Sequence, residues 1–113
     1  MQSVICDFPA VGPYVGVTRD RVIKFKTGKK SRSFRMIIFG AYNALGLIGS
    51  EFNGIAILDE DQRAVLCDRI ACESSGYFGP SPDQLREFDR LARLDWPSFR
   101  EFVNGHERTR YAI

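Results

Sequence analysis

The sequence predicts a small α+β domain, in which an antiparallel N-terminal β-meander or hairpin sheet packs against C-terminal helices. Polar and apolar residues alternate on both sides of Gly28, as in two paired strands. A Ser-Pro-Asp-Gln sequence at 81–84 has the composition of a helix start and is followed by helical apolar spacing. The length of 113 residues suits one domain spanning 1–113.

The most informative segment is 21–39, which is predicted to form two strands joined by a turn at Gly28. Alternation places Ile23 and Phe25 on one face. A four-residue loop, 28–31, would pair Phe25 with Phe34 and set Lys24 opposite Arg35, an unfavourable pair of like charges. A two-residue loop keeps the same division of faces and separates that charged pair, so both loops stay open.

Three further segments complete the N-terminal half. Residues 3–6 and 14–18 have the composition of short strands, and Arg19-Asp20 is predicted to form a tight turn into the hairpin. Residues 40–49 contain several glycines but no lysine of a phosphate-binding loop. They are therefore predicted to be a buried connecting segment.

The middle of the chain admits two interpretations. Asn53-Gly54 is a turn signal, and 55–58 is predicted to be a short buried strand. The favoured interpretation of 60–73 is a helix capped by Asp59, with one apolar face. The alternative is a hairpin that turns at 59–62 and returns as a strand over 64–71.

Two helices are predicted in the last third. Ser81 can cap the first and Gln84 can complete its capping box. The second begins near 95–97 and ends near Gly105. The residues expected to face the core are Leu85, Phe88, Leu91, Ala92, Trp96, Phe99, Phe102 and Val103.

Charge is distributed unevenly along the chain. The net charge is +2, but residues 1–50 hold eight basic residues against two acidic ones, and all four lysines lie between positions 24 and 30. An acidic partner is therefore expected at the hairpin. The alternative without a binding role is a solvated sheet edge on which lysines discourage aggregation. The candidate partner-binding residues are Lys24, Lys26, Lys29, Lys30, Arg32 and Arg35.

A second basic candidate lies on the first C-terminal helix. Arg86, Arg90 and Arg93 fall on one side of it and could extend the basic surface if helix and hairpin lie side by side. However, Glu87 and Asp89 are spaced to pair with Arg90 and Arg93. A mixed-charge solvated face is therefore favoured.

No catalytic or metal-binding set is recognisable. Cys6, Cys67, Cys72 and His106 could supply zinc ligands, but the spacing of the cysteines is poor, and core cysteines with a solvated histidine are expected instead. The cluster 59–61, Asp-Glu-Asp, follows a predicted strand and could hold magnesium, although a structural role is favoured. No metal and no cofactor are predicted.

Cysteine usage and hydropathy bear on the compartment. The odd number of cysteines and the lack of a signal-peptide pattern favour a reducing compartment, and the apolar run 36–49 is short for a membrane span. A cytoplasmic protein with no membrane partner is expected.

The favoured function is a small non-enzymatic binding protein whose basic hairpin acts on nucleic acid or on an acidic protein surface. The alternative is an inhibitor or accessory protein, of the kind phages and mobile elements encode, that binds a host nucleic-acid-handling complex. A metal-dependent phosphoryl-transfer enzyme, using the acidic cluster, comes third. The sequence does not indicate the oligomeric state.

Overall fold

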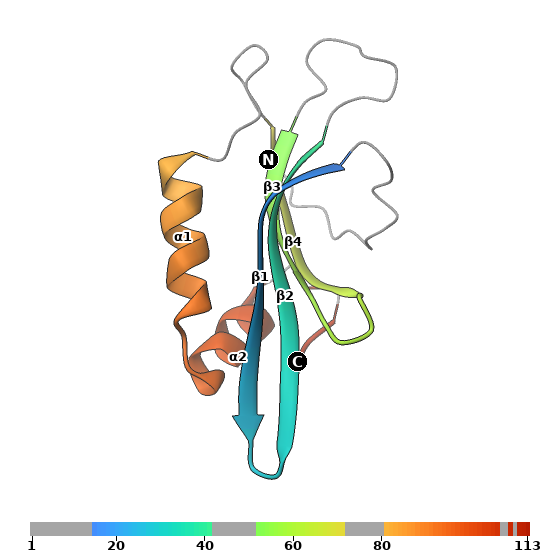
Figure 1. Ribbon diagram of the computed structural model, residues 1–113, viewed down its shortest axis with the longest axis vertical. Helices are drawn as coiled ribbons and strands as arrows, with labels where there is room; N and C mark the ends of the chain where they lie inside the picture. The colour runs from blue at the N-terminus through green and yellow to red at the C-terminus, as the bar shows by residue number, and fades with distance from the viewer. Residues whose placement is uncertain (1–14, 42–51, 72–80, 107–108, 110) are drawn as a thin grey trace.

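A computed structural model describes residues 15–41, 52–71, 81–106, 109 and 111–113. A four-stranded antiparallel meander, in the order β1-β2-β3-β4, is followed by two helices that contact the sheet, which confirms the α+β prediction (Figure 1). The elements are β1 (Val15–Thr27), β2 (Lys30–Ala41), β3 (Phe52–Leu58), β4 (Ala64–Ala71), α1 (Pro82–Ala92) and α2 (Trp96–Gly105). The predicted strand at 3–6 and most of the connecting segment at 40–49 lie outside the described residues.

A two-residue turn joins β1 to β2. Thr27 pairs with Lys30, and Gly28 adopts a φ of 70° at the first turn position, which a residue with a side chain would adopt at a cost. The predicted division of faces is correct, but the pairing of Phe25 with Phe34 through a four-residue loop is wrong. Ile23 pairs with Phe34, and Lys24 lies opposite a serine instead of Arg35.

Strand β1 is longer than the sequence predicts. The turn expected at Arg19-Asp20 is wrong, because β1 continues through these residues and Asp20 pairs with Ile37 of β2. The only break is a register shift between Val17 and Arg19, which is the position of a β-bulge. Polar residues suit this strand because it lies at an edge of the sheet.

Strand β3 contains Gly54, so the turn predicted at Asn53-Gly54 is also wrong. A Cβ atom at Gly54 would lie only 2.0 Å from the carbonyl oxygen of Asp68 and 2.8 Å from the ring of Phe39. Glycine is required here by close approach of the neighbouring strand and ring, and not by a chain reversal.

The chain turns after β3 and returns as β4, so the predicted helix over 60–73 is wrong. The alternative prediction, a hairpin that returns as a strand over 64–71, is correct. The backbone N–H of Gln62 donates to the Asp59 carbonyl at 3.0 Å, and Gln62 itself has a φ of 63°. Leu66 and Cys67 are both buried although they point to opposite faces of β4. A strand that is apolar on both faces has the continuous hydrophobicity of a buried helix.

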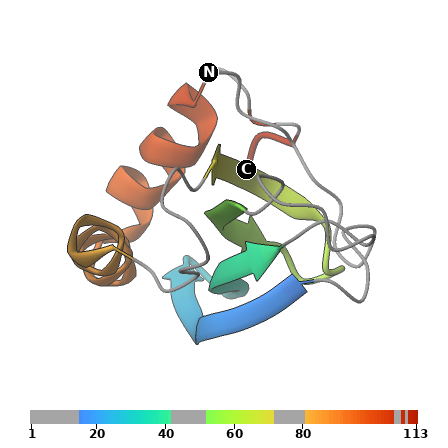
Figure 2. The same ribbon diagram turned by 90° about the horizontal axis from the view of Figure 1, so that it is seen from above.

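Both helices follow the predicted start signals. Ser81 caps α1 in a complete capping box with Gln84, and the Asp95 side chain caps α2 by accepting from the Ser98 backbone N–H at 2.9 Å. Figure 2 shows both helices on one side of the sheet, which we call the helix face. Among the described residues, neither helix is long and apolar enough to cross a membrane.

The sheet buries apolar residues on both faces. The cluster under the helices contains Ile23, Phe25, Phe34, Met36, Ile38, Ile57, Val65, Leu66, Phe88, Leu91, Phe99 and Val103. The opposite side, which we call the far face, has a second buried cluster of Ile37, Phe39, Ala56, Leu58, Ala64 and Cys67. Towards the β1–β2 turn the far face becomes polar, and Lys24 and Lys26 lie there.

Candidate functional site at the basic hairpin

Four of the six candidate residues are exposed lysines at the end of the hairpin. Lys24, Lys26, Lys29 and Lys30 are all exposed, and none has an ion-pair partner among the described residues. Alternation from Ile23 places Lys24 and Lys26 on the far face, and Lys29 lies in the turn itself. The turn extends past both helices (Figure 1), so approach to these lysines is open.

Arg35 is held by an acidic residue of the neighbouring strand. Its Nε donates to Asp20 Oδ1 at 2.9 Å and its Nη2 donates to Asp20 Oδ2 at 2.6 Å, a bidentate pair. The hydrogen bond from Arg35 lowers the pKa of Asp20. Arg35 is half-buried, and its charge is largely satisfied inside the chain.

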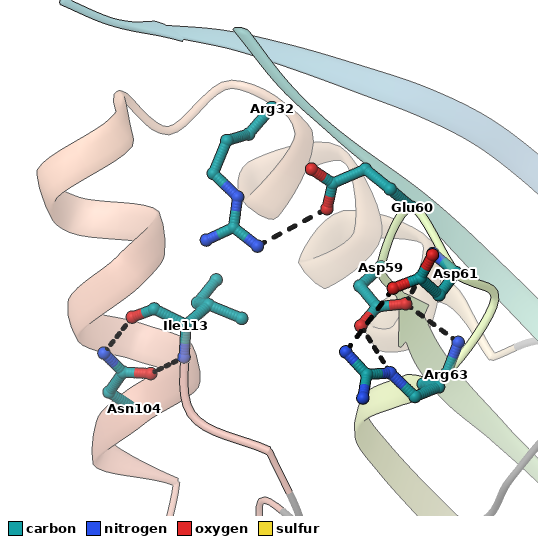
Figure 3. Close-up of polar contacts among 7 residues, drawn as sticks. All are labelled: Arg32, Asp59, Glu60, Asp61, Arg63, Asn104 and Ile113. Carbon is teal, nitrogen blue, oxygen red and sulfur yellow. Dashed lines mark hydrogen bonds and ion pairs between the residues drawn. The ribbon is translucent and has the colours of Figure 1, made fainter. Parts of the chain in front are cut away.

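Arg32 is likewise committed within the protein. It lies on the helix face, where its guanidinium carbon stands 4.9 Å from the Phe34 ring centre and 5.5 Å from that of Trp96. Its Nη2 is 3.4 Å from a carboxylate oxygen of Glu60, in the β3–β4 turn (Figure 3). Arg32 therefore stabilises the contact between hairpin, turn and α2, and it is removed from the exposed lysine group.

Sequence reasoning missed Arg19 and Arg21. Both are exposed on β1, and neither has an ion-pair partner among the described residues. Arg21 lies in the basic segment 21–39. Strand alternation puts it on the same face as buried Ile23, and so it does not indicate that Arg21 is exposed. Exposed basic side chains therefore lie along β1 from Arg19 to Lys26.

The aromatic residues of the hairpin face inward, as predicted. Phe25 lies 4.9 Å from Phe99 and 5.4 Å from Trp96, measured between ring centres. Phe34 is 5.2 Å from Phe99 and is almost fully buried. No aromatic ring of the described hairpin residues is therefore presented for stacking on a base.

The arginine stripe of α1 is mostly neutralised locally. Arg90 donates to both carboxylate oxygens of Glu87, and this hydrogen bonding lowers the pKa of Glu87. Arg86 pairs with Asp83. Arg93 is exposed, and the pair predicted between Asp89 and Arg93 is not among the ion pairs of the described residues. This stripe adds little to the lysine group.

The acidic cluster shapes a turn. Asp59 is buried, its Oδ1 accepts from the backbone N–H groups of Asp61 and Arg63, each at 2.9 Å, and its Oδ2 lies 3.1 Å from Arg63 Nε. Asp61 also pairs with Arg63 (Figure 3). All three carboxylates thus have partners within the chain, since Glu60 pairs with Arg32.

The zinc candidates that the structure describes lie on opposite faces of the sheet. Cys67 is buried in the far-face cluster. His106 is half-buried rather than solvated, and its Nε2 lies 2.9 Å from Asp68 Oδ2. Asp68 follows Cys67 in β4, so the two side chains point to opposite faces, and Cys67 and His106 cannot share an ion. Cys6 and Cys72 lie outside the described residues.

Comparison of the chain with protein-family models, curated proteins and solved structures gave no match. The geometry of the hairpin and the chemistry of its exposed side chains are therefore what indicate a function.

Proposed function

We propose that this chain is a small non-enzymatic binding protein whose basic hairpin binds the phosphate backbone of nucleic acid. The observation that supports this most is the group of four exposed lysines, Lys24, Lys26, Lys29 and Lys30, which have no ion-pair partner in the part of the chain that the structure describes and stand at an open end of the sheet. Phosphate groups attract such cations, and release of their counterions drives association.

The composition of the hairpin surface favours nucleic acid over a protein partner. Protein interfaces usually depend on one or two anchors, most often Trp, Tyr or Arg. At the hairpin end the exposed charged side chains are lysines, while Arg32, Arg35 and both phenylalanines are engaged inside the protein. Lysine acts as a point charge on phosphate and does not read base edges in a fixed geometry. The proposed binding is therefore weakly dependent on sequence.

The test is binding to single- and double-stranded oligonucleotides over a salt series, for the wild type and for a Lys29→Ala, Lys30→Ala double variant. Each phosphate contact contributes about 0.7 to 0.9 to the slope of log affinity against log salt. The double variant should flatten that slope by roughly 1.4 to 1.8 and should bind all sequences more weakly to a similar degree.

A matched control removes two charges elsewhere. An Arg86→Ala, Arg93→Ala variant changes the net charge equally, but on α1, and should leave the slope near that of the wild type. Equal effects of the two variants would show that net charge and not the hairpin drives binding. No binding at low salt would refute the proposal.

The competing partner is an acidic protein surface, including that of a host nucleic-acid-handling complex, and it must be distinguished from nucleic acid. Recovery of a defined complex from the native host that persists after nuclease treatment would favour it. Nuclease-sensitive recovery that also requires Lys29 and Lys30 would support nucleic acid. A cytoplasmic location is part of the same proposal.

A further inference from the structure

The free edge of β1 carries a self-complementary pattern. β1 pairs with β2 alone in the sheet order, so its other edge has no strand beside it among the described residues. Val22 lies near the middle of β1 and is 56% exposed, the one large hydrophobic residue in the described part of the chain to be so. Asp20 and Lys24 flank it two residues away on either side, on the same face.

The backbone of this segment is oriented outward. Thr27 and Lys30 close a two-residue turn and form a hydrogen-bonded pair, so β1 residues at every second position from Thr27 bond to β2. The intervening residues, Val22, Lys24 and Asp20 among them, direct their N–H and C=O groups to the free edge. Such a row of unpaired groups is a template for another strand.

We propose that the occupant of this edge is the β1 strand of a second copy, paired antiparallel about a two-fold axis at Val22. This register places Val22 opposite Val22 of the second copy and Lys24 opposite Asp20 of the second copy, twice by symmetry. Arg21 then faces Ile23 of the second copy, so no basic residue of the central segment faces another. Parallel, in-register pairing would instead oppose each lysine to itself.

Asp20 can accept this further contact. Each of its oxygens already accepts one hydrogen bond from Arg35, and a carboxylate has about four acceptor positions. Lys24 of the second copy approaches from the free edge, on the side away from β2. Cross-strand pairs of apolar and opposite-charge residues are those that stabilise sheets.

The pairing would align two hairpins on one sheet. Gly28 lies six residues beyond Val22, so the two turns would stand about 40 Å apart, which corresponds to about 12 base pairs of duplex. This consequence goes beyond the proposed function and depends on it: duplexes longer than about 12 base pairs should engage Lys26, Lys29 and Lys30 of both hairpins and bind more tightly than shorter ones.

The pairing itself is tested without nucleic acid, so its failure and that of the proposed function are distinguishable. Sedimentation of the full chain over a concentration series should approach twice the 12.8 kDa of one chain. The amides of Val22 and Lys24 should gain protection from hydrogen exchange over the same range. Val22→Lys should give a monomer. Val22→Thr, which retains a β-branched residue, should pair more weakly and should melt like the wild type at concentrations where both are monomeric.

Charge reversal tests the register. Asp20→Lys alone and Lys24→Glu alone each set like charges opposite each other and should be monomeric. Their equimolar mixture restores two attractive pairs and should form a heterodimer. A wild type that stays monomeric at millimolar concentration would overturn the proposal, and so would a dimer insensitive to these substitutions. The proposal would also be overturned if the edge amides gained protection from hydrogen exchange only when an acidic peptide was added. In that case the partner of the edge would be a strand of another molecule and not a second copy.

Discussion

Arg32 and Glu60, 28 residues apart in the sequence, form an ion pair that joins the basic hairpin to the β3–β4 turn. The guanidinium group also lies over the rings of Phe34 and Trp96, so one side chain contacts β2, the turn and α2. Arg32, which the charge pattern predicts to bind a partner, is thus part of the internal structure.

Replacing Arg32 should therefore affect stability more than binding. Arg32→Ala is expected to lower the free energy of unfolding by about 1 kcal/mol, through lost stacking on Trp96 and a partly exposed ion pair. Arg32→Lys should recover less than half of this, because an ammonium group lacks the planar surface that stacks. Urea unfolding measures both. Unchanged stability with a large loss of nucleic-acid affinity would instead identify Arg32 as a ligand-binding residue.

The two faces of the hairpin should differ sharply on substitution. Phe25→Ala removes a buried ring from contact with Trp96 and Phe99 and should cost about 3 to 5 kcal/mol. Lys26→Ala, at the neighbouring exposed position, should cost under about 0.5 kcal/mol. Urea denaturation curves of the two variants give the comparison, and the reverse order would mean that the assignment of faces is inverted.

Gln62 adopts a backbone conformation that favours glycine. It follows a reverse turn closed by the bond from its N–H to the Asp59 carbonyl, and its φ is 63°. Gln62→Gly should raise the free energy of unfolding by about 0.5 to 1 kcal/mol, because the relief of strain exceeds the added entropy of the unfolded chain. Asp61→Gly, which has no positive φ to relieve, should destabilise. Thermal melts of both variants separate the two effects.

The pair between Asp20 and Arg35 should make stability depend on acid pH. Arg35 lowers the pKa of Asp20, so the contribution of the pair is present above the ordinary aspartate pKa and is lost as pH falls through the lowered value. Its size should stay under about 1 kcal/mol because both side chains are 42% exposed and solvent screens the pair. The melting temperature of Asp20→Asn should be below that of the wild type by a constant amount between about pH 5 and 8. That difference should shrink below about pH 4; a constant difference down to pH 2 would contradict the assignment.

The two-residue period of a strand explains which features of this fold the sequence predicts. Alternation correctly separates buried Phe25 from exposed Lys24, because a strand has a period of two. It cannot distinguish a two-residue from a four-residue loop, since both preserve the faces. Asn53-Gly54 has the composition of a turn, but Gly54 is fixed by the approach of Asp68, a contact that sequence does not reveal.

The candidate site was predictable only in part. The exposed lysines follow from local composition and alternation. The commitment of Arg35 to Asp20 and of His106 to Asp68 depends on residues 15 and 38 positions away, which only strand pairing and helix packing bring together. The charges available to a partner are those that form no such pair, and they can be identified only once the fold is known.

The meander order has a consequence for synthesis of the chain on the ribosome. Each strand pairs with its neighbour in sequence, so the sheet can assemble progressively as residues emerge, without waiting for distant segments. The helix face is different: Phe25 and Phe34 contact each other within the hairpin, but the rings of Trp96 and Phe99 cover them only after those residues have been added. Throughout that interval the nascent sheet exposes an aromatic surface, and Lys24 and Lys26 on its other side are charges that oppose premature association.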